Sequence, residues 1–321
     1  MKRILVVAAL ILGGCTSDNG RHGNGTAPGG GDGGTGTGGN GGTGGTGGGA
    51  GGGGQPQNSG CGKMDILFIV DDSGSMSEEQ ANLGKNFPKF IDVLNAYSTS
   101  GGTPLDYHVG LTTTSLSDGA PPIPLPIPIP IPMGDDGALR NKSNCGMTRP
   151  WIERTDSNPA MQFACVANVG TMGSGHEQPL NGANLALTDR VADGKNAGFM
   201  RTDALLAVVM LTDEDDQSGD PKNASSSPQP VDNFIKSFDT VKGGHDRWAT
   251  AVIAGPTNCM SAFGSAQEAV RLKDFVMKSG QQAVFSSICD GDLAKSLDDA
   301  LHTFKAACES FPPIGRTVQD H

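Results

Sequence analysis

The sequence has few basic residues, no long hydrophobic run and no closely spaced pair of cysteines. Lysine and arginine number 23 against 34 aspartates and glutamates, which gives a formal net charge of −11. An acidic surface repels nucleic acid, and no basic patch interleaved with aromatic residues occurs, so we expect no nucleic-acid partner. The lack of a Cys-x-x-Cys pair argues against a structural zinc site or a thiol redox centre.

Motifs of common enzyme classes are also missing. His176-Glu177 begins like the zinc motif His-Glu-x-x-His, but the second histidine is absent. Ser174 lacks the Gly-x-Ser-x-Gly setting of a hydrolase nucleophile, and its loop lacks the Lys-Ser/Thr ending of a phosphate-binding loop. Because no nucleophile–base pair is evident either, the sequence predicts that the protein is not an enzyme.

The first residues are typical of an export signal. The basic start Met1–Arg3 precedes an apolar run, Ile4–Leu12, that is too short to span a bilayer as a mature helix. Leu12-Gly-Gly-Cys15 resembles a lipobox, in which a signal peptide of residues 1–14 is removed and Cys15 is acylated. A plain secretory signal is the alternative. The residue after the cysteine is Thr16 and not an aspartate. By the resemblance to Gram-negative lipoproteins, this implies the outer membrane of the cell envelope.

Residues 15–60 follow as a tract dominated by glycine with threonine, asparagine and serine. Such a tract cannot bury a core, so we expect a disordered tether. The folded domain is predicted to span 61–311, with a tail at 312–321. Of the seven cysteines, six remain after acylation of Cys15, enough for three disulfides in an oxidising compartment.

A short apolar strand ending in an oxygen-rich turn is the most informative stretch of the chain. Residues 65–76 read Asp-Ile-Leu-Phe-Ile-Val-Asp-Asp-Ser-Gly-Ser-Met, and the apolar part is predicted to be a buried strand. Asp71, Ser73 and Ser75 follow the pattern Asp-x-Ser-x-Ser, whose three oxygen side chains can converge on one hard cation. Helix capping by Ser75 or Ser77 is the alternative, and both interpretations can hold together.

Two later loops carry further oxygen ligands. The apolar run Ala204–Leu211 is typical of a strand buried on both faces, and it ends in the acidic stretch 212–216, Thr-Asp-Glu-Asp-Asp. Ligands bind at the carboxyl ends of strands in open α/β sheets, although an acidic run is more often simply solvated. The glycine-rich loop 169–178 leads into a helix predicted to begin at Pro179.

Strands and helices alternate along the rest of the folded part. The alternation predicts an α/β domain with a mostly parallel, six-stranded sheet and helices on both faces. Besides the first strand we expect strands at 105–113, 204–211, 248–254 and 283–288 and an antiparallel edge strand near 151–154. We expect helices at 77–97, 179–188, 231–241, 262–278 and 292–307.

The stretch 65–76 resembles the first strand and the metal-ion-dependent adhesion site (MIDAS) of the von Willebrand factor type A (VWA) domain. The resemblance extends over roughly Cys61–Phe311. It implies a doubly wound, Rossmann-like α/β fold, a divalent cation at the top of the sheet, and adhesion or assembly through ligand binding instead of catalysis. By this resemblance Asp213 is the second aspartate of the site.

The sequence departs from the VWA pattern where that family supplies a threonine to the metal. Glu177 is the nearest oxygen ligand by position, with Ser174 and Thr171 as alternatives. The predicted metal ligands are Asp71, Ser73, Ser75, Glu177 and Asp213. Hard oxygen ligands suit Mg²⁺ first, with Ca²⁺ or Mn²⁺ as alternatives.

Glu177 would add a negative charge, which strengthens metal binding and disfavours an acidic ligand. The predicted function is metal-dependent binding of an unidentified protein or surface ligand by a lipid-anchored module. The alternative is a structural module of the cell envelope in which the metal only stabilises the loops or is absent.

An insertion is expected at about 115–165. Pro121–Pro132 alternates proline with isoleucine or leucine, which enforces polyproline II and indicates a stiff insertion or, alternatively, a ligand for an aromatic groove. Within it we expect a Cys145–Cys165 disulfide, because a segment with so little core needs one. The first strand and last helix bring Cys61 and Cys308 to the bottom of the domain, and Cys259 and Cys289 both follow strands at the top, so those pairs are our hypothesis.

Overall fold

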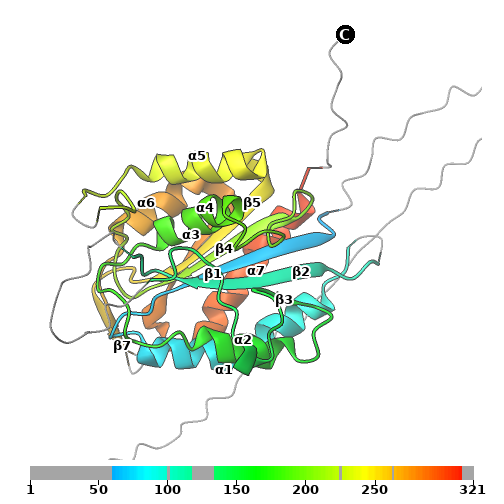
Figure 1. Cartoon of the computed structure of the whole chain (residues 1–321), viewed down its shortest axis with the longest axis horizontal. Coiled ribbons are helices and arrows are strands. Elements are labelled where there is room, and N and C mark those ends of the chain that lie inside the picture. The colour runs from blue at the N-terminus through cyan, green and yellow to red at the C-terminus, as the bar shows by residue number, and fades with distance from the viewer. Residues whose placement is uncertain (1–59, 100–101, 118–133, 224–225, 262–263, 313–321) are drawn as a thin grey trace, which may run out of the picture. The chain divides into compact units, whose positions relative to one another are not determined.

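A six-stranded sheet with helices on both faces forms the folded part of the chain (Figure 1). The computed structural model describes residues 60–99, 102–117, 134–223, 226–261 and 264–312. The predictions for Cys15, the glycine-rich tract and Pro121–Pro132 lie outside these residues. No helix in the described ranges is both long and apolar enough to cross a membrane.

The strand order is β3-β2-β1-β4-β5-β8, and every neighbouring pair is parallel except β2 with the edge strand β3. The α/β class and the mostly parallel sheet are therefore as predicted. The strands of the sheet are β1 (Lys63–Val70), β2 (Asp106–Thr113), β3 (Ile152–Glu153), β4 (Leu205–Leu211), β5 (Trp248–Ala254) and β8 (Ala283–Ser287). The helices are α1 (Ser77–Ala96), α2 (Pro159–Ala167), α3 (Pro179–Leu187), α4 (Asp189–Ala192), α5 (Val231–Lys242), α6 (Val270–Ser279) and α7 (Leu293–Glu309).

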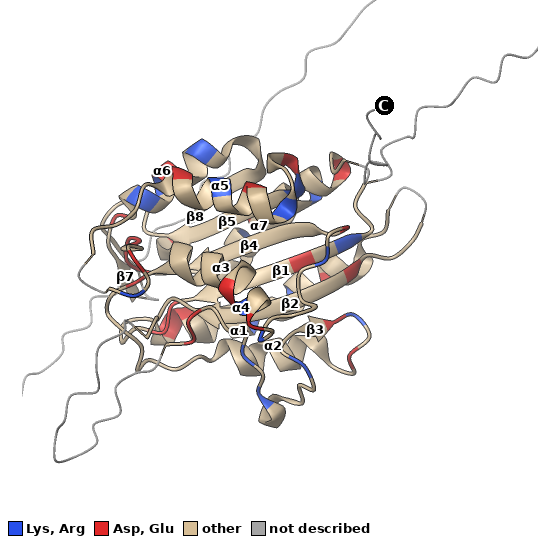
Figure 2. Cartoon of the chain, turned by 45° about the horizontal axis from the view of Figure 1, so that its top comes forward, with Lys and Arg blue, Asp and Glu red and all other residues tan. Residues whose placement is uncertain are grey.

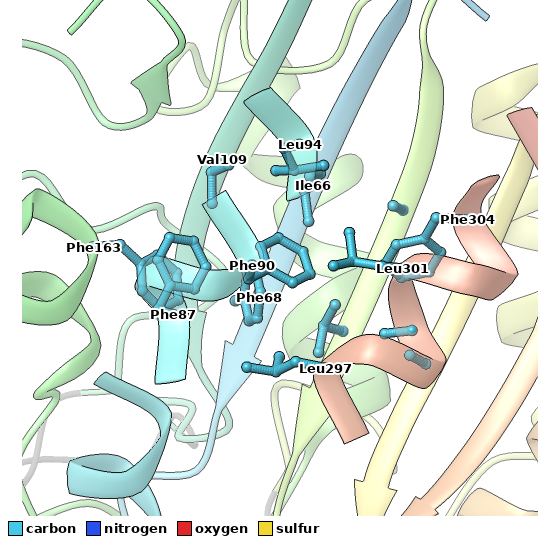
Figure 3. Packing of buried hydrophobic residues seen from close by; sticks show 14 of the residues in the cluster. Ile66, Phe68, Phe87, Phe90, Leu94, Val109, Phe163, Leu297, Leu301 and Phe304 are labelled. Atoms are coloured by element: carbon cyan, nitrogen blue, oxygen red, sulfur yellow. The ribbon is translucent and has the colours of Figure 1, made fainter. Parts of the chain in front are cut away.

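Central strand β1 divides its side chains between two cores. Successive residues of a strand point to opposite faces, so Ile66 and Phe68 join one apolar cluster while Leu67 and Ile69 join the other. The first cluster packs under α1, α2 and α7, and the second under α3, α5 and α6. Figure 3 shows the first cluster around Phe68, whose ring meets those of Phe87, Phe90 and Phe163 from α1 and α2.

Two parts of the secondary structure differ from the sequence prediction. The helix expected at 262–278 begins only at Val270, because the preceding residues form a small antiparallel hairpin of β6 (Cys259–Ser261) and β7 (Gly264–Ala266). Gly264 has φ +127°, a conformation that no helix accommodates. Helix α2 is not among the helices that the sequence predicted, but its residues Phe163 and Val166 are buried in the first core.

The structure contains the three disulfides that the sequence predicted. Cys61 is joined to Cys308, Cys145 to Cys165 and Cys259 to Cys289. The first closes the two ends of the domain, where the backbone N–H of Cys61 also donates to the Cys308 carbonyl at 2.9 Å. The third attaches the β6–β7 hairpin to the turn that follows β8.

Candidate metal centre

Two acidic loops meet where β1 and β4 end. These strands are parallel neighbours whose last residues, Val70 and Leu211, are paired, so the residues after them emerge side by side. The backbone N–H of Asp71 donates to the Leu211 carbonyl at 3.0 Å, and the Thr212 hydroxyl donates to Asp71 Oδ2 at 2.7 Å. Asp71 and Asp213 therefore lie at the same end of the sheet. Figure 2, which colours Asp and Glu red, shows acidic positions on the loops near β7, which lies at this end.

The Asp-x-Ser-x-Ser turn folds its oxygens toward one another. The backbone N–H of Ser73 donates to Asp71 Oδ1 at 2.8 Å, and the Ser73 and Ser75 hydroxyls lie 3.3 Å apart. Ser75 in turn hydrogen-bonds the Asp213 side chain. Neither Ser75 nor Ser77 is the N-cap of α1: the N-cap residue is Met76, which makes no side-chain cap bond. The capping alternative is thus wrong for these two serines.

Glu177 is the residue of the third loop that reaches this group. Its side chain is fully buried, the negative charge of Asp71 acts on it, and the Thr114 hydroxyl donates to its Oε2 at 3.0 Å. Of the two alternatives, the Ser174 hydroxyl instead accepts a hydrogen bond from the His176 backbone at 3.0 Å. Nothing links Thr171 to the carboxylates in the part of the chain that the structure describes.

Two carboxylate oxygens of the group have no hydrogen-bond donor among the described residues. They are Oε1 of Glu177 and Oδ1 of Asp213, whose side chains are both buried. No lysine, arginine or histidine forms an ion pair with Asp71, Glu177 or Asp213 within the same residues. A buried, unpaired carboxylate is costly unless a proton or a cation neutralises it.

Burial and like charge change the protonation of these acids. Burial raises the pKa of Asp71 to about 6 and raises that of Asp213 above its ordinary value. Burial, followed by the negative charge of Asp71, raises the pKa of Glu177 to about 9. The three acids therefore hold protons more tightly than free carboxylates do. A hard divalent cation would take the place of those protons.

The group fits such a cation only with help from the serines. Among the described residues no three His, Cys, Asp or Glu side chains come close enough together to hold a metal by themselves. At least one of the three carboxylates would therefore reach the ion through a water molecule, which Mg²⁺ commonly retains, and the hydroxyls of Ser73 and Ser75 would be further ligands. The donor set consists of oxygen atoms alone, which suits a hard ion.

Asp215 and Asp216, the last residues of the acidic stretch 212–216, are engaged in contacts that stabilise the fold. Asp215 accepts backbone hydrogen bonds at the start of α6, at 2.9 Å from Arg271 and 3.2 Å from Leu272. Asp216 is buried, accepts from the Leu180 backbone and forms a 3.0 Å ion pair with Arg271. Only Asp213, with Glu214 on the rim, remains available to a cation.

Thr114 and Thr212 were not predicted as site residues, although both donate to site carboxylates. Each is the first residue after the end of a strand, β2 or β4, at the edge of the sheet where the acids lie. This position in the sequence was the one available signal.

Comparison with solved structures finds similarities, among them two distant ones. No protein-family model matches the chain, and no curated protein matches it. Proximal thread matrix protein 1 of the mussel byssus is 13% identical, with 76% of this chain and 49% of that chain covered and a TM-score of 0.40. The pilus adhesin SpaC of Lactobacillus rhamnosus GG is 12% identical, with 76% and 31% covered and a TM-score of 0.39. This chain thus spans less than half the length of either protein, and the similarity carries no argument about function.

Proposed function

We propose that this domain binds a divalent cation, preferentially Mg²⁺, and uses it to bind a protein or surface ligand. The proposed ligands are Asp71, Ser73, Ser75, Glu177 and Asp213. The observation that carries the proposal is the group of three buried carboxylates without a basic partner among the described residues, two of which have an oxygen without a donor. Such a group is stable only when a positive charge or protons enter it.

The surrounding residues would prepare the site for the ion. The Ser73 backbone and the Thr212 hydroxyl fix the Asp71 carboxylate from two sides, and Thr114 fixes one oxygen of Glu177. These bonds leave Glu177 Oε1 and Asp213 Oδ1 free to coordinate. When bound, the cation would supply a Lewis-acidic position that an oxygen of the ligand completes.

The family and location belong to the same proposal. The Asp-x-Ser-x-Ser turn after the central strand and the strand order support a doubly wound fold of the VWA type, with the proline-rich segment as an insertion between β2 and β3. Three disulfides support an oxidising compartment. With the lipobox at Cys15, this favours a lipid-anchored protein of the cell envelope, and the acyl chain would be its membrane contact.

Calorimetric titration of the full chain with Mg²⁺ tests the proposal. Asp71→Ala removes a central ligand and should weaken cation binding by at least about 100-fold. Asp92→Ala is the matched control, because Asp92 is an exposed acid on α1, roughly 22 Å along the helix from Ser77 at its start. Equal affinities of the Asp71→Ala variant and the unaltered chain would refute the assignment.

A further inference from the structure

A cavity of about 610 Å³ opens beside the candidate metal centre. Ser75, Asp213 and Glu214 line one side of it, and the β6–β7 hairpin with the residues next to it lines the other. The Asp213 side chain is 3% exposed, and its Oδ1 has no hydrogen-bond donor in the part of the chain that is described. A ligand in this cavity would therefore meet both the cation site and a second wall.

The hairpin wall is held in place by several contacts. The Cys259–Cys289 disulfide joins it to the turn after β8, and the Gln267 backbone N–H donates to the Asp213 carbonyl at 2.8 Å. The Gln267 side chain also donates to Glu214 Oε1 at 3.1 Å. The wall is thus formed before any ligand arrives, which lowers the entropy cost of binding.

The hairpin wall carries an apolar side chain that is largely exposed to solvent. Met260 lines the cavity and is 84% exposed. Methionine is flexible and polarisable, so it adapts to apolar side chains of varied shape and is common on peptide-binding surfaces.

The charged residues that line the cavity are all acidic. Asp213 and Glu214 are its charged lining residues, and the carboxylate of Glu79 lies directly against Gly264 of the hairpin. One oxygen of Glu79 has no hydrogen-bond donor among the described residues. Asp71, Glu177 and Asp213, when ionised, already exceed the charge of a divalent cation by one unit. An acidic ligand would be repelled here, whereas a neutral oxygen and a basic side chain would be attracted.

We infer, on the basis of the proposed function, that the cavity binds an exposed segment of a partner protein that is basic and not acidic. A neutral carbonyl oxygen of that segment would complete the cation's shell. A lysine or arginine would lie against Glu214, and an apolar neighbour would pack on Met260.

Selection from a phage-displayed library of random dodecapeptides on the immobilised full chain, with Mg²⁺ present, tests this inference. The recovered peptides should be enriched severalfold in lysine and arginine over the starting library, and their binding should weaken in EDTA. Glu214→Lys should abolish the enrichment in basic residues, and Met260→Asn should reduce that in apolar residues. Asp92→Lys, with the same charge change far from the cavity, should alter neither.

The outcomes separate this inference from the proposed function. Calorimetry of the unaltered chain with Mg²⁺ alone reports on the cation site, and circular dichroism shows that Glu214→Lys is folded. Cation binding together with peptides enriched in aspartate or glutamate, or with no enriched peptides, would overturn the basic ligand and leave the metal centre standing. Capture of oligosaccharides in place of peptides on a glycan array would overturn it as well. Absence of cation binding would refute the proposed function and this inference together.

Discussion

Glu177 combines in one side chain the burial, the like-charged neighbour and the unpaired oxygen that characterise the candidate metal centre. It is fully buried, lies under the influence of the Asp71 charge and retains one oxygen without a donor among the described residues. Without a cation, the fold has to tolerate either a protonated carboxyl or a buried charge at this position. Stability in the absence of metal should therefore depend on pH.

The sign of that dependence follows from the pKa of Glu177. Its folded value of about 9 lies above the ordinary value of about 4.3 for an unfolded chain. The associated stability is therefore fully present below the unfolded value and is lost as the pH rises through about 9. Asp71, whose pKa is raised to about 6, acts in the same direction. In EDTA the protein should melt at a higher temperature at pH 5 than at pH 9, and Mg²⁺ should reduce that difference.

Replacing Glu177 by glutamine tests the same residue directly. The amide keeps the size of the side chain but carries no charge, so in EDTA at pH 9 Glu177→Gln should be more stable than the unaltered chain by roughly 1–3 kcal/mol. The same variant should bind Mg²⁺ more weakly. Chemical unfolding and calorimetry measure the two effects. A variant that is less stable than the unaltered chain in EDTA at pH 9 would contradict the account of Glu177.

Among individual residues, the sequence could predict candidate site residues that follow closely on the end of a buried strand. Asp71 and Asp213 could each be placed at the carboxyl end of a buried strand, where ligands bind in such sheets, and their assignment to one site came from the resemblance to a known metal-binding pattern. Thr114 and Thr212 could not be predicted as donors, because threonine after a strand is common and its partner depends on the rotamer. The roles of Asp215 and Asp216 also needed the structure, since they depend on where α6 begins.

At the scale of elements, the acidic stretch after β4 has two roles: Asp213 belongs to the candidate cation site, and Asp215 caps helix α6. Helix α6 has no side-chain cap of its own, and Asp215, which is distant in sequence, accepts hydrogen bonds from its first turn. A carboxylate at this end of a helix satisfies free N–H groups and the positive end of the helix dipole.

Asp215→Ala should therefore destabilise the domain by about 0.5–2 kcal/mol, as the loss of an N-cap does. Its affinity for Mg²⁺ should not change, because Asp215 is engaged at α6. Asp213→Ala should show the opposite pattern, with lost cation binding and little loss of stability in EDTA. Urea unfolding and calorimetry on both variants measure this contrast. Loss of Mg²⁺ binding in Asp215→Ala would show that the division of roles is wrong.

Elements with strong periodicity could be predicted, and the short ones could not. Helix α1 and the apolar strands β1, β4 and β5 carry their pattern over seven residues or more. The hairpin that displaced the start of α6 comprises two strands of three residues, stabilised by a disulfide and by contacts with the site loops. Helix α2 has nine residues and depends on burying Phe163 in the aromatic cluster, which local sequence does not report.

At the scale of the whole molecule, the Cys61–Cys308 disulfide closes nearly the entire domain into one loop, with a sequence separation of 247. In the chain-entropy view, a disulfide that closes a longer loop restricts the unfolded state more. Its removal by the double change Cys61→Ala and Cys308→Ala should lower the free energy of unfolding by about 5–6 kcal/mol. Removal of Cys145–Cys165, which spans 20 residues, should cost about 3 kcal/mol. Urea unfolding of the two double variants measures both values, and a larger loss for the shorter loop would contradict this account.

Strand β1 separates the disulfide-closed end of the domain from the candidate metal centre. The strand begins two residues after Cys61, at the disulfide-closed end, and its eight residues cover roughly 26 Å before Asp71. The chain before Gly60 therefore joins the domain at the pole opposite the candidate metal centre. A covalent attachment ahead of Cys61 would enter the domain about one strand length from Asp71, so the point of attachment itself would not compete with a visiting molecule for the acidic pole.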